Sequence, residues 1–281
     1  MYHGTTLIYY YDGSFEGFLC CVFRAIYQRE EPLSILPEQE AQPTLLETVW
    51  VDTDPEKAQR VLDSIPAKLG RDALRIIKLC FLSALSDREI ALLSFLRLGY
   101  QVGPQILQML TDERVYDVVI AARAVSGEAH LLKGFTRFSQ YGGMLVAEIE
   151  PRHQVLPILG KHFQARMPGE SFLILDRTHR LALACSGGQI STVPITEARL
   201  PPADRREQFY RQLWTRFYDT VAIEARYNPQ CRMTHMPKRF WNTMTEFQEE
   251  NRPWALPEHS RPICEKNTAK TPCVQTPDKV Q

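Results

Sequence analysis

Basic and titratable side chains recur at helical spacing in the middle of this chain. His130, Lys133 and Arg137 fall on one side of a predicted helix, and Gly134 between them leaves room for a ligand or another backbone. A phosphate group suits such a face, because a guanidinium can donate a bidentate pair of hydrogen bonds to it. These residues are therefore candidates for binding an anion.

An internal ion-pair network explains the same face without any ligand. Charged groups that lie among apolar residues are costly unless they find partners. Glu128 and Glu148 are the nearby carboxylates that could pair with these cations. The pattern leaves both interpretations open.

A second predicted helix carries His162 and Arg166 four residues apart and therefore on one face. This pair could bind an anion, or it could place a neutral imidazole base near a cation, although a single helix histidine is more often structural. Asp176 ends a predicted strand just before a turn, where an aspartate commonly accepts hydrogen bonds from its own turn backbone. The candidate catalytic residues are His130, His162 and Asp176. The candidate phosphate ligands of this region are Lys133, Arg137 and Arg166.

The most basic stretch lies near the end of the chain. Its polar members are Arg226, Asn228, Arg232, His235, Lys238 and Arg239. Aromatic residues alternate with them, and such a mixture can hold single-stranded or distorted nucleic acid through phosphate contacts and base stacking. Arg226, Lys238 and Arg239 are the candidate phosphate ligands here. The alternative is that Phe240 and Trp241 anchor the last helix to the core.

Composition indicates an ordinary globular protein without an overall electrostatic preference. The net charge is +0, although residues 12–63 hold 11 acidic and 4 basic residues and residues 199–239 hold 9 basic and 4 acidic ones. The seven cysteines form no CxxC pair, so neither a metal site nor a cofactor is predicted. Scattered thiols, the lack of a signal peptide and the lack of a membrane-spanning window predict a cytoplasmic protein.

The order of predicted elements indicates an α+β fold that is mainly helical. The first elements are a strand at 7–11, a turn at 12–14, a helix at 15–27, a loop at 30–44, a strand at 48–52 and helices from 55 to about 138. The segment Ser86-Asp87-Arg88-Glu89 matches a capping box at the start of one of these helices.

A small antiparallel sheet covered by one helix is predicted next. Its elements are strands at 144–150, 171–176, 181–185 and 189–194 and a helix at 154–166.

Two further helices are predicted after the sheet: Asp204 caps a long helix, and Pro237 opens a short final one. The apolar stripe of the long helix consists of Tyr210, Trp214, Phe217 and Val221. We expect a single α+β domain over residues 1–250 and a disordered proline-rich tail over residues 251–281.

Five separated motifs give the chain a resemblance to a known bacterial family. They are YDGSFEGFL (residues 11–19), EAHLLKGFTRF (128–138), HFQAR (162–166), Asp176, and the series LW…RYNP…MPKRFW between residues 213 and 241. In this order they resemble a family of DNA metabolism or DNA repair proteins. Its members are typically encoded beside a DNA-modification radical SAM protein, and some are fused to a uracil-DNA glycosylase domain.

The resemblance implies an accessory protein of DNA repair or modification that binds DNA and acts with a radical SAM partner. That partner would supply the iron–sulfur cluster, and the residues after 250 are too few for a glycosylase domain. One alternative is a nucleotide- or DNA-processing hydrolase that uses His130 or His162 as general base and Arg137 as a clamp. Another is a protein-interaction subunit that does not contact DNA.

Stability measurements discriminate between a binding site and a core ion-pair network. If Arg137 and Arg166 form a site, replacing either with alanine should weaken DNA binding and leave the thermal midpoint nearly unchanged. A large loss of stability in both variants would indicate core ion pairs instead.

Overall fold

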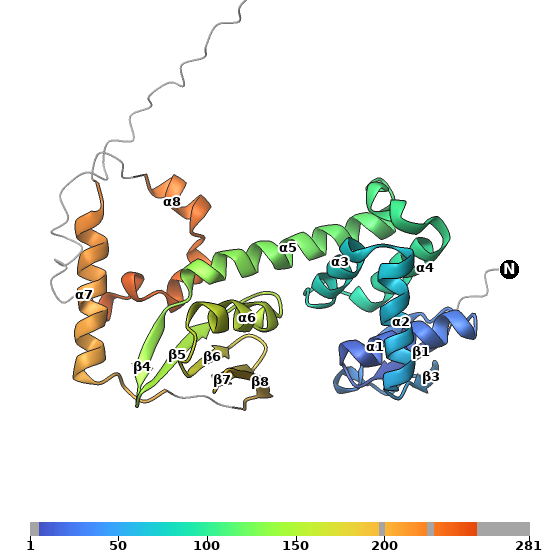
Figure 1. Cartoon of the computed structure of the whole chain (residues 1–281), viewed down its shortest axis with the longest axis horizontal. Coiled ribbons are helices and arrows are strands. Elements are labelled where there is room, and N and C mark those ends of the chain that lie inside the picture. Colours follow the sequence, from blue (N-terminus) through green and yellow to red (C-terminus); the bar gives the residue numbers. More distant parts are fainter. Residues whose placement is uncertain (1–5, 197–199, 224–227, 252–281) are drawn as a thin grey trace, which may run out of the picture.

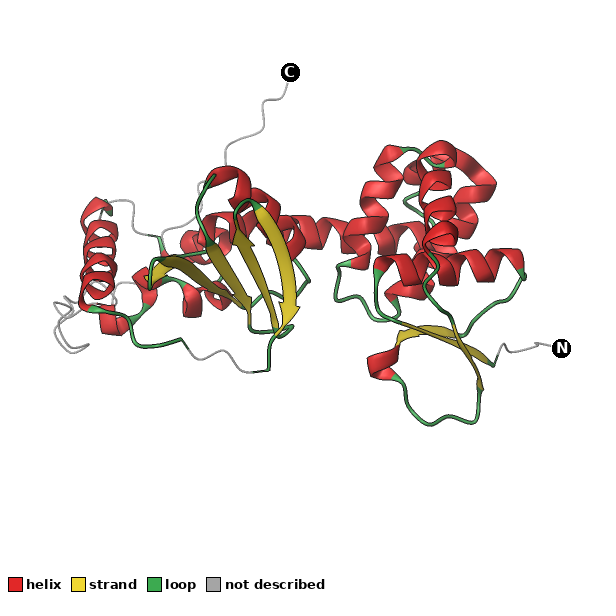
Figure 2. Cartoon of the chain, turned by 60° about the horizontal axis from the view of Figure 1, so that its bottom comes forward, coloured by secondary structure: helices red, strands yellow, loops and turns green. Residues whose placement is uncertain are grey.

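The computed structural model describes residues 6–196, 200–223 and 228–251, and it confirms the predicted α+β class (Figure 1). Two large hydrophobic cores follow one another along these described residues, and the long helix α5 (Glu113–Phe135) contributes to both. Val118 belongs to the first core, whereas Leu132 belongs to the second. We call the parts around these cores the first and the second lobe. Figure 2 shows one β-sheet in each lobe.

A three-stranded parallel sheet opens the first lobe. Strand β1 (Leu7–Tyr11) lies between β2 (Ser34–Pro37) and β3 (Glu47–Trp50). Strand β1 is confirmed as predicted, and β3 overlaps the strand predicted at 48–52. Strand β2, however, lies in a segment predicted to be a loop. The prediction failed there because β2 is a four-residue edge strand that ends in a proline, a residue that is depleted in strands.

Helix α1 (Phe15–Tyr27) begins after the turn at the end of β1, as predicted. The Ser14 hydroxyl caps it by accepting a hydrogen bond from the Gly17 N–H at 2.9 Å. The Asp12 carboxylate accepts from the Ser14 N–H at 2.9 Å and from the Thr53 hydroxyl at 2.8 Å. The polar groups of this turn therefore hold the backbone in place.

The remaining helices of the first lobe are α2 (Pro55–Lys68), α3 (Arg71–Phe81) and α4 (Arg88–Val102). The predicted capping box before α4 is wrong, because the N-cap residue Asp87 has a φ of 52° and makes no side-chain capping bond. Glu89 is buried instead, accepts a hydrogen bond from the Tyr11 hydroxyl at 2.9 Å and pairs with Arg88. The Glu89 carboxylate therefore bonds to Tyr11 and Arg88 and does not cap the helix.

A five-stranded sheet forms the second lobe. Its strands, in spatial order, are β4 (Phe138–Tyr141), β5 (Met144–Ile149), β6 (Phe172–Asp176), β7 (Leu181–Ser186) and β8 (Gln189–Pro194). The predicted antiparallel sheet is wrong at one pair, because β5 and β6 are parallel, with Leu145 opposite Phe172. Helix α6 (Leu156–Arg166) makes the crossover that parallel neighbours require. Strand β4 begins at Phe138, where a helix was predicted.

Helix α7 (Arg205–Val221) follows the sheet, and the Asp204 carboxylate caps it by accepting from the Glu207 N–H at 2.8 Å. Helix α8 (Pro229–His235) comes next. The predicted final helix is a series of short 3-10 turns at Lys238–Thr243, Thr245–Phe247 and Glu249–Asn251. Phe240 is buried in the second core, which confirms its predicted anchoring role. The tail predicted to be disordered lies beyond Asn251, outside the described residues.

The apolar stripe of α7 contacts neither core. Its members Phe209, Tyr210, Leu213, Trp214, Phe217 and Val221 are between 41% and 61% exposed. Figure 1 shows α7 in orange at the edge of the second lobe. Within the described part of the chain, none of the helices combines the length and the apolar character that crossing a bilayer requires.

Candidate nucleic-acid interface

Arg137 lies just beyond the end of α5 and not on its face. The helix ends at Phe135, and the extended backbone of Thr136 (φ −61°, ψ 128°) redirects the chain into β4. The predicted basic helix face of His130, Lys133 and Arg137 is therefore wrong for Arg137. Only the first two of these residues lie on α5.

A bidentate ion pair with Glu246 holds Arg137 in place. Nη2 lies 2.7 Å from Oε1, and Nε lies 3.2 Å from Oε2. Nη1 of Arg137 also donates to the Gly134 carbonyl at 2.7 Å. The Glu246 side chain is 1% exposed. An internal ion pair was predicted as the alternative, but its suggested acceptors Glu128 and Glu148 pair with other arginines.

Glu246 is stabilised as a carboxylate despite its burial. Burial by itself raises the pKa of this carboxyl, but hydrogen bonds from Arg137 and Trp214 bring the pKa below its ordinary value. The indole Nε1 of Trp214 donates to Oε2 at 3.1 Å. The guanidinium of Arg137 stands 5.6 Å from the centre of the Trp214 ring. These three residues join the end of α5, helix α7 and residues 238–251, which we call the C-terminal segment, into one unit.

Two cavities meet at Arg137. The first, which we call the aromatic groove, has a volume of about 820 Å³ and lies between the end of α5, β4 and α7. It is lined by Gly134, Phe138, Tyr210, Leu213, Trp214 and Phe217, among others. The second, the polar cavity, has a volume of about 870 Å³. It is lined by Ser139, Tyr141, Glu148, Arg177, Gln212 and Gln248, among others. Arg137, Arg211 and Thr245 line both.

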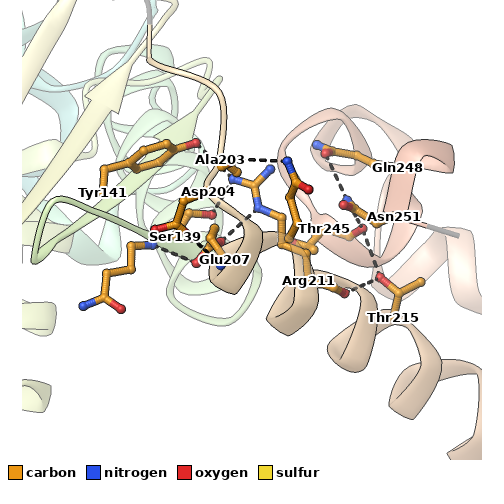
Figure 3. Close-up of polar contacts among 12 residues, drawn as sticks. Ser139, Tyr141, Ala203, Asp204, Glu207, Arg211, Thr215, Thr245, Gln248 and Asn251 are labelled. Atoms are coloured by element: carbon orange, nitrogen blue, oxygen red, sulfur yellow. Dashed lines mark hydrogen bonds and ion pairs between the residues drawn. The ribbon is translucent and has the colours of Figure 1, made fainter. Parts of the chain in front are cut away.

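A set of polar contacts fixes α7 against β4 (Figure 3). Glu207 accepts from Arg211 Nε at 2.9 Å and from the Gln140 N–H at 3.0 Å. Arg211 Nη2 donates to the Ser139 hydroxyl at 2.9 Å and to the Tyr141 hydroxyl at 3.0 Å. Burial raises the pKa of Glu207, yet these hydrogen bonds bring it below its ordinary value. The Glu207–Arg211 pair thus positions α7 against β4.

The C-terminal segment binds the same helix through the Thr245 carbonyl (Figure 3). This oxygen accepts from the buried Thr215 hydroxyl at 3.5 Å and from the Asn251 amide at 3.2 Å. The Thr215 hydroxyl also donates to the Arg211 carbonyl at 2.9 Å. These contacts attach α7 through polar groups, whereas the apolar side chains of its stripe remain 41–61% exposed.

Lys133, His162 and Arg166 come together where α5 packs against α6. Partial burial lowers the pKa of His162, and the positive charges of Lys133 and Arg166 lower it further. Among the described residues, neither Lys133 nor Arg166 forms an ion pair. We call these three residues the cation cluster. His130 is exposed one turn earlier on α5.

Asp176 accepts hydrogen bonds from its own turn, as the structural alternative predicted. Its fully buried carboxylate accepts from the N–H groups of Thr178 and His179, both at 3.0 Å, and lies 2.7 Å from Nδ1 of His179. It lines neither the aromatic groove nor the polar cavity. Among residues 6–196, 200–223 and 228–251, no group of three or more histidine, cysteine or acidic side chains is arranged to hold a metal ion.

The two basic C-terminal candidates that lie among the described residues, Lys238 and Arg239, have different surroundings. Arg239 pairs with Glu128 at 3.0 Å, and this glutamate side chain is only 2% exposed. The ammonium of Lys238 is 5.9 Å from the centre of the Trp241 ring. Arg226 lies outside the described residues. Arg239 therefore links the C-terminal segment to α5, and Lys238 remains an exposed cation beside an aromatic ring.

Sequence reasoning did not identify Glu207, Arg211 or Glu246. The first two are four residues apart with opposite charges, a spacing that could have indicated a helix ion pair. Glu246 gives no local signal, because its partner Arg137 is 109 residues away in sequence. The stripe that contains Trp214 was recognised, but periodicity cannot tell an exposed stripe from a buried one.

The comparisons with known proteins identify one family. Residues 86–246, more than half of the chain, match the family described as a domain of unknown function, DUF4130. This span contains α5, the five-stranded sheet, α7, the cation cluster and the Arg137–Glu246 pair. A search of curated proteins gave no match, and neither did a search of solved structures. The chain belongs to the DUF4130 family.

Proposed function

We propose that this protein binds nucleic acid as an accessory protein of DNA repair or DNA modification. The cation cluster is the observation that carries the proposal, because Lys133 and Arg166 converge without an ion pair in the described part of the chain. Gly134, the next residue after Lys133, lines a groove with exposed aromatic rings. Cations that bind phosphates and rings that stack on bases are the two components of single-strand binding surfaces.

The three residues of the cation cluster have different roles in this proposal. Lys133 and Arg166 are the phosphate ligands. His162 adds a third positive charge when it is protonated, because its imidazole is then a cation with two donors. Arg137 is not a phosphate ligand, because Glu246 already neutralises it at 2.7 Å.

Equilibrium binding to labelled oligonucleotides tests the proposal. In fluorescence anisotropy, the Lys133→Ala/Arg166→Ala double variant should bind a DNA oligonucleotide roughly tenfold more weakly or worse, since it loses two charge-assisted contacts. The matched control is Arg75→Ala/Lys78→Ala, which removes two exposed cations from α3 in the first lobe. Equal affinities of the two double variants would contradict the proposal.

Cooperation with a radical SAM protein is the second part of the proposal, and the motif resemblance supports it. We expect the two proteins to co-purify after co-expression and to shift labelled DNA in a gel more strongly together than separately. Turnover of a damaged oligonucleotide by the isolated chain, abolished by His162→Ala, would favour the hydrolase alternative instead. Co-purification without any DNA shift would favour the protein-interaction alternative.

A further inference from the structure

We propose that the aromatic groove holds an unpaired base, so that the preferred ligand is single-stranded or locally opened nucleic acid. This step rests on the nucleic-acid binding proposed above. Helix α7 carries six apolar side chains that are 41–61% exposed, and four of them (Tyr210, Leu213, Trp214 and Phe217) line the groove. A contiguous apolar surface of this kind marks a binding site in soluble proteins.

The groove presents aromatic rings from two elements. On α7 the rings of Trp214 and Phe217 are 5.9 Å apart with 30° between their planes. From β4 comes Phe138, which packs edge-on against Phe163 at 5.0 Å and is thereby fixed to the core. Every nucleobase has a flat ring face, so stacking in such a groove tolerates any sequence. The volume of about 820 Å³ lies within the range of roughly 300–1,000 Å³ found for small-molecule sites.

Arg137 adds a fixed planar group to the inner end of the groove. Its guanidinium stands 5.6 Å from the centre of the Trp214 ring, and the bidentate pair with Glu246 sets its orientation. Because its charge is neutralised, it is suited to contact a base and not a phosphate. Guanidinium planes stack on bases in the same way as aromatic rings do.

A cation stands beside one of the rings that line the groove, and the backbone at the end of α5 is accessible. The guanidinium of Arg206 stands 5.8 Å from the centre of the Tyr210 ring, and it forms no ion pair within the described residues. At the end of α5, Gly134 lines the groove and has no atom within 4 Å of the position of an added Cβ, so a ligand can approach the backbone at the residue that follows Lys133. A nucleic-acid strand offers phosphates and ring faces at regular spacing. In duplex DNA the ring faces are stacked on one another, so a duplex can contact the cations but cannot place a base in the groove.

Affinities for a single-stranded oligonucleotide and for the duplex of the same sequence test this inference. Trp214→Ala and Phe217→Ala should each bind the single strand roughly tenfold more weakly, since one stacking platform is lost, and should bind the duplex like the wild type. Phe209→Ala is the matched control, because Phe209 is an exposed aromatic residue of α7 outside the groove. Trp214→Ala also removes the hydrogen bond to Glu246 and can therefore destabilise the fold. Phe217→Ala removes a ring of the groove without removing that bond.

A direct readout is photo-crosslinking with an oligonucleotide that carries 5-iodouracil. The crosslink should map to the α7 peptide that contains Trp214 and should disappear in Trp214→Ala. The groove assignment is overturned if Phe209→Ala weakens binding as much as Phe217→Ala, or if the variants lose affinity for single strand and duplex equally. Neither result contradicts phosphate binding by the cation cluster. Self-association that Trp214→Ala abolishes would also overturn it. If the wild type binds neither oligonucleotide, the proposed function itself fails.

Discussion

Individual basic residues of the second lobe differ in whether a carboxylate already neutralises them. Arg137 and Arg239 are each paired with a buried glutamate, whereas Lys133 and Arg166 have no ion pair among the described residues. Removing one partner of a buried pair leaves an uncompensated charge in the interior. The first two residues therefore stabilise the fold, and the second two are available to a ligand.

Arg137→Ala should lower the stability strongly, whereas Arg166→Ala should not. Loss of Arg137 removes the bidentate ion pair of the buried Glu246 carboxylate, and breaking a buried pair of this kind costs about 3–5 kcal/mol. Loss of an exposed, unpaired arginine typically costs within about 0.5 kcal/mol. Thermal unfolding followed by circular dichroism would measure both variants. Equal midpoints for the two would show that the ion pair with Glu246 contributes nothing.

DNA affinity should rise as the pH falls below neutrality, and His162 should be responsible for part of that rise. Burial and the charges of Lys133 and Arg166 lower its pKa, so the imidazole is neutral at pH 7. A bound phosphate favours the protonated ring, and protonation on acidification therefore strengthens binding. Anisotropy titrations at intervals of about one pH unit, between about pH 7.5 and about pH 5.5, would compare the wild type with His162→Gln. Identical pH profiles of the two proteins would contradict this role.

Helix α7 is attached to the second lobe by polar contacts and keeps an exposed apolar stripe. The helix is held by Glu207 and Arg211 against β4 and by Thr215 against the C-terminal segment (Figure 3). Trp214 and Phe217 of the same helix line the aromatic groove and are 41% and 55% exposed. Polar attachment of this kind explains how an aromatic stripe can remain exposed on a fixed helix.

Glu207→Ala should loosen α7 without unfolding the lobe. The substitution leaves the Gln140 N–H and the Arg211 guanidinium without their carboxylate acceptor, which costs about 1–3 kcal/mol. Hydrogen exchange should become faster in α7 and at Gln140, and remain unchanged in α3. Arg205→Ala, at the exposed start of the same helix, serves as the control. Unchanged exchange at Gln140 would show that this pair does not hold α7.

At the scale of the whole molecule, local patterns predicted the elements better than their pairing. Helices α1 and α7 and strand β8 follow from side-chain periodicity, because that information lies within a dozen residues. The parallel pairing of Tyr9 with Ile35, or of Leu145 with Phe172, joins segments that periodicity does not connect. The same limit applies to the site, since Arg137 and Glu246 are 109 residues apart in sequence. The cation cluster was partly predictable because His162 and Arg166 lie on one turn of α6.

The salt dependence of single-strand binding tests most directly whether the cation cluster contacts phosphates. Each phosphate contact contributes about 0.7 to the slope of log affinity against log salt concentration for single strands, so removing two should reduce the slope by about 1.4. We expect Lys133→Ala/Arg166→Ala to show that reduction and Arg75→Ala/Lys78→Ala to keep the wild-type slope. A slope that is the same in all three proteins would contradict nucleic-acid binding by the cation cluster.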